Sequence, residues 1–126
     1  MSEQVKILTV LPHSTGDCIH GPAIKFSLGE MELTYDYLSG SGEQWAVLRF
    51  VRALAVKFTP DLAVSAEMIK AYSKVCWMDD SVWLMQTMQS AADHAGTIPE
   101  DTKHLLLYFD HYGCVEVLAQ GVEILK

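Results

Sequence analysis

The stretch IKFSLGEMELTYDY, Ile24 to Tyr37, constrains the fold more than any other part of the chain. It predicts two strands joined at Gly29-Glu30 by a type II′ turn, because glycine takes the positive φ of the first turn position at little cost. This turn pairs apolar residues throughout: Leu28 with Met31, Phe26 with Leu33, and Ile24 with Tyr35. The polar positions fall on the opposite face of the hairpin: Lys25, Ser27, Glu32, Thr34 and Asp36. Turn chemistry and hydrophobic alternation therefore indicate the same hairpin.

The composition is that of one packed domain spanning residues 1–126, since half of the residues are hydrophobic. The net charge of −7 argues against sequence-independent binding of DNA or RNA, which requires Lys and Arg to neutralise phosphates. An acidic protein is instead complementary to a basic partner. The three cysteines form no CxxC motif, and the start MSEQVKILTVL lacks a signal-peptide cleavage pattern. No apolar run approaches a membrane span, so we expect a soluble, cytoplasmic protein.

Three helices are predicted in the middle of the chain, after a flexible link at Ser39 to Gly42. The first covers EQWAVLRFVRALAVKF, Glu43 to Phe58, because Ser41 and Gln44 have capping-box spacing and the apolar residues form two wide helical faces. It is expected to cover the apolar face of the hairpin. The second covers Leu62 to Val75, begins at Thr59-Pro60-Asp61, and is compatible with a break at Ser65. The third covers Val82 to Ala95, follows the cap Asp79-Asp80-Ser81, and ends at Gly96.

Strands are predicted at both ends of the chain. Val5 to Leu11 is a β-branched run, followed by a polar loop from Pro12 to Pro22. After the helices come His104 to Asp110, Cys114 to Ala119, and Val122 to Leu125. The order β-β-β-α-α-α-β-β-β predicts an α+β fold, in which helices cover one face of an antiparallel sheet of about five to six strands.

One candidate chemical site lies in the loop HSTGDCIHG. Its His, Asp and Cys side chains are zinc ligands by type, and the turn near the C-terminus offers more. The loop candidates are His13, Asp17, Cys18 and His20, and the additional ones are Asp110, His111 and Cys114. The same loop permits a Cys–His nucleophile. The spacing matches no paired zinc pattern, so we assign no metal, cofactor or catalytic residue. A metal- or small-ligand-binding protein or enzyme using this loop is an alternative function.

The function we predict is binding of another protein. Asp79 and Asp80 stand beside Trp77 and Trp83, and aromatic residues are enriched in interfaces. The second choice of interface is the acidic face of the hairpin, with Glu30, Glu32 and Asp36. A small acidic binding module without a catalytic set fits a stoichiometric inhibitor or neutraliser of a protein with a basic surface, either immunity-protein-like or a phage-encoded inhibitor such as an anti-CRISPR. A self-associating structural subunit, a homodimer paired through the hairpin edge, is a further alternative.

Overall fold

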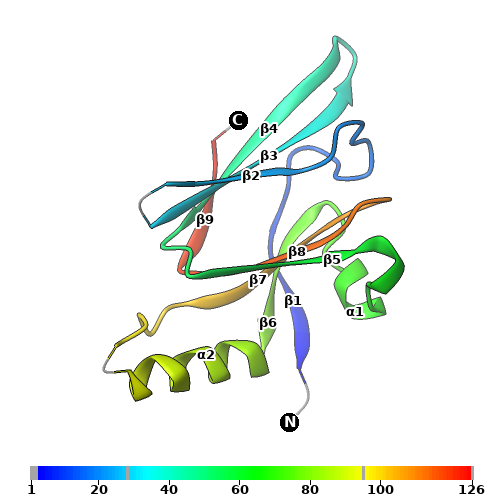
Figure 1. The fold of residues 1–126 in the computed structure, drawn as a ribbon. Helices are drawn as coiled ribbons and strands as arrows, with labels where there is room; N and C mark the ends of the chain where they lie inside the picture. The colour runs from blue at the N-terminus through cyan, green and yellow to red at the C-terminus, as the bar shows by residue number, and fades with distance from the viewer. Residues whose placement is uncertain (1–2, 28, 95, 126) are drawn as a thin grey trace.

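A computed structural model describes residues 3–27, 29–94 and 96–125, and shows two antiparallel sheets that pack on each other (Figure 1). The five-stranded sheet has the order β1-β6-β7-β8-β5, and the four-stranded sheet has the order β2-β3-β4-β9. The strands are β1 (Gln4–Val10), β2 (Ala23–Ser27), β3 (Glu30–Ser39), β4 (Gly42–Val51), β5 (Ala55–Pro60), β6 (Lys74–Asp79), β7 (Lys103–Phe109), β8 (Gly113–Ala119) and β9 (Gly121–Ile124). The helical segments are η1 (Asp61–Ala63), α1 (Ala66–Ile69) and α2 (Val82–Asp93).

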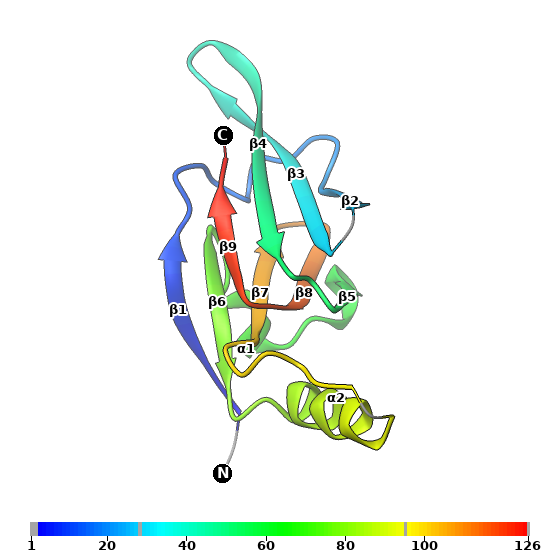
Figure 2. The same ribbon diagram turned by 90° about the vertical axis from the view of Figure 1, so that its left-hand side faces the viewer.

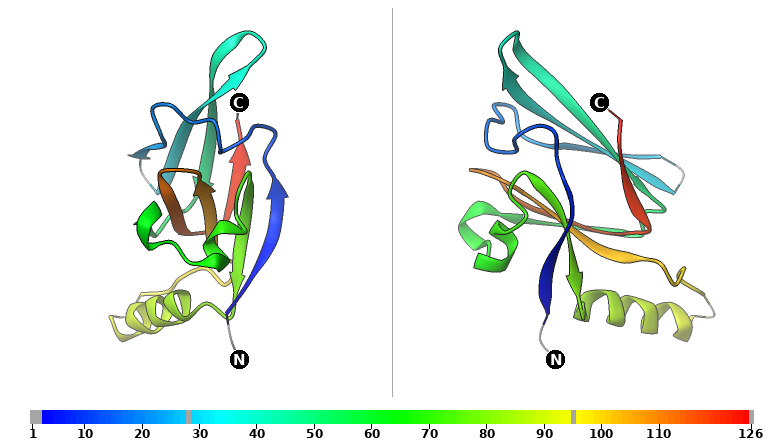
Figure 3. Two further views of the ribbon diagram at one scale, coloured as in Figure 1. Left: turned by 90° about the vertical axis from the view of Figure 1, so that its right-hand side faces the viewer. Right: turned by 180° about the vertical axis from the view of Figure 1, so that it is seen from behind.

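The predicted α+β architecture, with three helices covering a single sheet, is wrong. The described part of the chain is mostly β, and α2 is its only helix longer than two turns. Each sheet covers the inner face of the other, so the helices do not supply the main core. Figure 2 shows α2 extending from one end of the molecule, with β1 and β9 on one side and β2 and β5 on the other; Figure 3 shows the same arrangement from two further directions.

The first predicted helix, Glu43 to Phe58, is instead the two strands β4 and β5. Along β4 the buried residues Ala46, Leu48 and Phe50 alternate with partly exposed ones, which is the period of a strand. Val47 and Val51, on the other face of the strand, are also apolar. With apolar residues on both faces, the sequence fits the pattern of a helix that is apolar on two sides. Ser41 caps no helix, because it lies in the turn between the paired Ser39 and Gly42.

The predicted hairpin forms, with a different register. Ser27 pairs with Glu30, so Phe26 faces Met31 and Ile24 faces Leu33. The turn is therefore one residue earlier than predicted, and the predicted pairing of Leu28 lies outside the described residues. Opposite residues still share a face, so the same apolar set points inward. Inward-pointing residues of β3 are fully buried, whereas Phe26 on the edge strand β2 remains 61% exposed.

The second predicted helix, Leu62 to Val75, is also wrong, since only short helical turns form there before β6. Ser65, where the sequence allowed a break in that helix, is the N-cap of the four-residue helix α1. The third predicted helix is confirmed as α2, and it is capped by the side chain of Ser81 rather than by Asp79 or Asp80. Its predicted last residue, Ala95, lies outside the described residues. The first strand and the three C-terminal strands are confirmed within one or two residues.

The core lies between the two inner faces. Tyr35 of β3 meets Phe109 of β7 edge to face, with ring centroids 5.3 Å apart. The side chains around them are completely or almost completely buried and come from both sheets: Met31, Leu33, Leu48, Phe50, Val75, Leu105, Leu107, Val115 and Val117. A smaller cluster on the outer face of the five-stranded sheet includes Cys76, Leu106 and Cys114, with Met68 of α1 packed against it. The expected cover of the hairpin by a helix is thus replaced by cover from the second sheet.

Gly113 provides a test of the close approach between β5 and β8. Its φ is 141°, and an added Cβ would overlap the backbone oxygen of Thr59 on the paired strand. We expect Gly113→Ala to lower the free energy of unfolding by about 2–3 kcal/mol, measured by urea denaturation. The control is Gly40→Ala, where nothing lies within 4 Å and φ is not positive. Equal stability of the two variants would contradict the described contact.

Candidate functional site

The predicted metal-ligand loop does not close on itself. His13 stacks on Tyr37 with ring centroids 3.8 Å apart, whereas His20 turns toward Glu43, with 3.3 Å between Nε2 and Oε1. Cys18 packs against the core. The four proposed loop ligands, His13, Asp17, Cys18 and His20, therefore do not form one group. The C-terminal candidates do not join them, since Cys114 is fully buried and the exposed His111 lies 3.6 Å from its neighbour Asp110.

His20 instead lies close to Asp36 of β3 and Glu43 of β4. Among the residues described by the structure, only His20, Asp36 and Glu43 form a group of at least three His, Cys, Asp or Glu residues whose potential ligand atoms all lie within 4.8 Å of one another. From the sequence, His20 was a candidate ligand and Asp36 a predicted residue of the acidic hairpin face, whereas Glu43 was not predicted to take part in any site. The strand alternation could have predicted this group. Asp36 pairs with Trp45 across β3 and β4, so the two side chains lie on the same face of the sheet.

Asp36 corrects the expectation of an exposed acidic face on the hairpin. Its side chain is buried, because the loop before β2 folds over it. The N–H of Ile19 donates to Oδ2 at 2.7 Å, and the N–H of His20 donates to the same oxygen at 3.1 Å. Burial alone raises the pKa of this carboxyl, but the backbone N–H donors and the nearby His20 outweigh burial and lower it. Asp36 therefore attaches the loop to the sheet and is not available to a docking partner.

Cys18 lies in surroundings that suppress its reactivity. Burial raises the pKa of its thiol to about 12, and the negative charges of Asp36 and Asp17 add to the rise. A nucleophilic cysteine requires the opposite environment, with a cation or a helix N-terminus that stabilises the thiolate. The Cys–His nucleophile considered from the sequence is therefore not supported by this geometry.

This environment predicts slow alkylation of Cys18. In the folded protein at pH 8, we expect iodoacetamide to modify Cys18 at least about tenfold more slowly than it modifies glutathione, because so little thiolate is present. Peptide mass spectrometry over a time course measures the rate, and protein unfolded in urea serves as the control. Modification of Cys18 in the folded state as fast as in urea would contradict the assignment.

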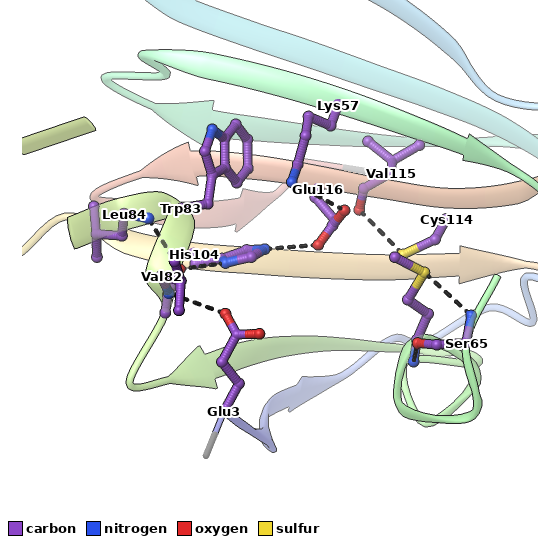
Figure 4. Close-up of polar contacts among 12 residues, drawn as sticks. Glu3, Lys57, Ser65, Val82, Trp83, Leu84, His104, Cys114, Val115 and Glu116 are labelled. Atoms are coloured by element: carbon purple, nitrogen blue, oxygen red, sulfur yellow. Dashed lines mark hydrogen bonds and ion pairs between the residues drawn. The ribbon is translucent and has the colours of Figure 1, made fainter. Parts of the chain in front are cut away.

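A buried polar network that the sequence did not reveal lies on the outer face of the five-stranded sheet (Figure 4). His104 of β7 contacts Oε1 of Glu116 through Nε2 at 2.8 Å and the Oγ of Ser81 through Nδ1 at 2.6 Å. All three residues are buried. The signal in the sequence was a charged or titratable residue inside each of two otherwise apolar strands, HLLLYF and CVEVLA. Buried groups of this kind require partners, which predicts a contact between them.

Ser81, His104 and Glu116 are hydrogen-bonded in the order serine–histidine–carboxylate, as in a hydrolytic triad. Their other contacts indicate a structural role. Ser81 Oγ also accepts the N–H of Leu84 at 3.0 Å, and so caps α2. Both ring nitrogens of His104 have a hydrogen-bond partner, so the imidazole is satisfied within the protein. Glu3 Oε2 accepts the N–H of Val82 at 2.9 Å and supports the same helix start. The network therefore attaches the N-terminus of α2 to the sheet.

On the side of Glu116 that faces Lys57, the network borders a solvent-accessible cavity. Lys57 of β5 lies 4.0 Å from Glu116 Oε2, and its Nζ lies 4.2 Å from the centroid of the Trp83 ring. A cavity of about 560 Å³ surrounds these groups. Its wall includes Glu3, Glu67, Met68, Met78, Gln86 and His104. Trp83, predicted as an anchor beside Asp79 and Asp80, thus lines this cavity with Lys57.

Removal of Glu116 tests the network. We expect Glu116→Ala to lower the free energy of unfolding by about 3 kcal/mol, because it leaves His104 without its buried partner. Glu123→Ala is the matched control, since Glu123 pairs with Arg49 at 3.8 Å on the exposed surface and such pairs contribute less than about 1 kcal/mol. Denaturant unfolding of both variants gives the comparison. A Glu116→Ala variant as stable as the control would show that the network does not hold α2.

The predicted acidic and aromatic residues do meet at the other side of the α2 start. Trp77, Asp79 and Asp80 line a groove of about 280 Å³ between the end of β6 and α2. Its other lining residues include Met78, Leu84, Met85, Met88 and Lys103. Asp79 lies 3.1 Å from Lys6, whose Nζ is 5.4 Å from the centroid of the Trp77 ring. Asp80 has a positive φ of 54° and is exposed. The groove therefore combines an apolar lining with two carboxylates at its end, of which Asp79 pairs with Lys6 and Asp80 is exposed, and Lys103 also lines it.

The hairpin face chosen second is mixed in charge rather than acidic. Glu32 pairs in register with Lys25 on one side and Arg49 on the other. Arg49 in turn lies 4.0 Å from Glu30 and opposite Glu123 of β9. Alternating signs across the outer face of the four-stranded sheet compensate one another.

Comparisons with known proteins assign no family. No family model matches the chain, and neither a curated protein nor a solved structure matches it. Within the described residues, no helix has the length and apolar character that crossing a membrane requires.

Proposed function

We propose that this protein binds another protein through the groove between α2 and the end of β6. The partner presents a basic surface, and binding neutralises or inhibits it stoichiometrically, as an immunity protein or a phage-encoded inhibitor does. The observation that carries the proposal is the convergence of Trp77, Asp79 and Asp80 with the methionines of α2. The net charge of −7 supports a basic partner.

Helix α2 supports the proposal because it is poorly covered. None of its residues is buried, and Met85 is 62% exposed. Methionine is a flexible residue that adapts to varied partners, and it is enriched in interfaces. A partner that entered the groove would bury Met85 and the ring of Trp77. Apolar burial would then contribute affinity, while the two carboxylates would select for Lys or Arg.

Charge reversal at the groove tests the proposal. The variant is Asp79→Lys with Asp80→Asn, since asparagine tolerates the positive φ at position 80. We expect protein capture from the native host, read by mass spectrometry, to lose the dominant basic partner. Affinity for that purified partner should fall by about tenfold or more, with a larger loss at low salt because screening is weaker there.

The matched control is Asp93→Lys with Glu100→Gln. It changes the net charge by the same amount at positions that do not line the groove. Circular dichroism checks that both variants are folded. If both variants lost the same affinity, the loss would be due to net charge alone. That result would contradict binding through the groove. Light scattering of the free protein distinguishes this proposal from the alternative of self-association, which requires a dimer.

A further inference from the structure

We propose that His20, Asp36 and Glu43 form a binding site for a divalent transition-metal ion such as Zn²⁺. The three side chains come from the loop before β2, from β3 and from β4, and their potential ligand atoms lie within 4.8 Å of one another. One imidazole and two carboxylates are a donor set that zinc accepts, with a fourth position for water. This site is separate from the proposed function, since none of its residues lines the groove beside α2.

The spacing of the donor atoms suits a metal ion. The contact between His20 Nε2 and Glu43 Oε1 is 3.3 Å. Two ligands that each lie about 2.0–2.2 Å from a tetrahedral zinc ion are separated by roughly 3.4 Å. The side chains of His20 and Glu43 are exposed, whereas that of Asp36 is buried beneath the loop.

The protein holds the site in place before a metal ion arrives. The N–H of His20 donates to both carboxylate oxygens of Asp36, at 3.2 and 3.1 Å, so the backbone of one ligand is attached to the side chain of another. The imidazole of His20 lies nearly parallel to the Trp45 ring, at 11° and 6.1 Å between centroids. Trp45 is opposite Asp36 in the sheet and two residues from Glu43. Such supporting contacts orient ligands and raise metal affinity.

The donor groups also suit a cation. Asp36 is buried, and its carboxylate is oriented by the N–H groups of Ile19 and His20. Glu43 offers a second carboxylate, and the imidazole of His20 points its Nε2 toward it. A bound metal ion uses all three groups together.

Titration of untagged protein with ZnCl₂ tests the site. We expect isothermal calorimetry and elemental analysis after dialysis to give one zinc per chain, and zinc to raise the melting temperature. His20→Gln and Glu43→Gln should each weaken zinc binding by about 10- to 100-fold or more and remove the rise in melting temperature. Asp36 is left unchanged because it also attaches the loop.

The controls are His94→Gln and Glu123→Gln, which change the same residue types outside the group. Both controls should bind zinc as the unaltered protein does. Absence of stoichiometric zinc binding by the folded protein would overturn the site. Zinc binding that survives both His20→Gln and Glu43→Gln would overturn it as well, because the metal would then lie elsewhere. Neither result bears on partner capture through the groove, so the two proposals fail independently.

Discussion

The packing of two sheet faces against each other is the constraint on which the rest of the structure depends. Tyr35 and Phe109 meet at the centre of that interface, and fully buried aliphatic side chains of both sheets surround them. Once each inner face covers the other, the helices are not needed to close the core. They are left at the outer face and at one end of the five-stranded sheet, where they remain largely exposed.

Buried polar groups then attach the irregular segments to this frame. Asp36 accepts the backbone N–H groups of the loop before β2, and the network of Ser81, His104 and Glu116 attaches the start of α2. In both places the titratable side chain belongs to a strand, Asp36 in β3 and His104 in β7. Each accepts or shares a hydrogen bond with a segment that is distant in sequence. A buried hydrogen bond is costly to leave unmade, so each attachment specifies one position for its segment.

The two candidate sites follow from these attachments. Asp36 holds His20 near Glu43, and so creates the group proposed to bind a metal ion. Ser81 holds the start of α2 near the end of β6, and so places Met85 beside Trp77 and the two aspartates. On the outer face of the four-stranded sheet, acidic and basic side chains alternate across the strands. The groove beside α2 combines apolar and acidic character more closely.

The sequence by itself determined the features that depend on local chemistry. These include the hairpin after the loop, the start of α2 at Ser81 and the C-terminal strands. Only the tertiary structure decided that residues 43–58 are strands, because a stretch that is apolar on two sides satisfies helical and strand periods equally until a second sheet covers it. The tertiary structure also decided that Asp36 is buried and that His20 meets Glu43 rather than Cys18. Those contacts join distant segments, and local sequence patterns do not encode which distant segment will cover a given face.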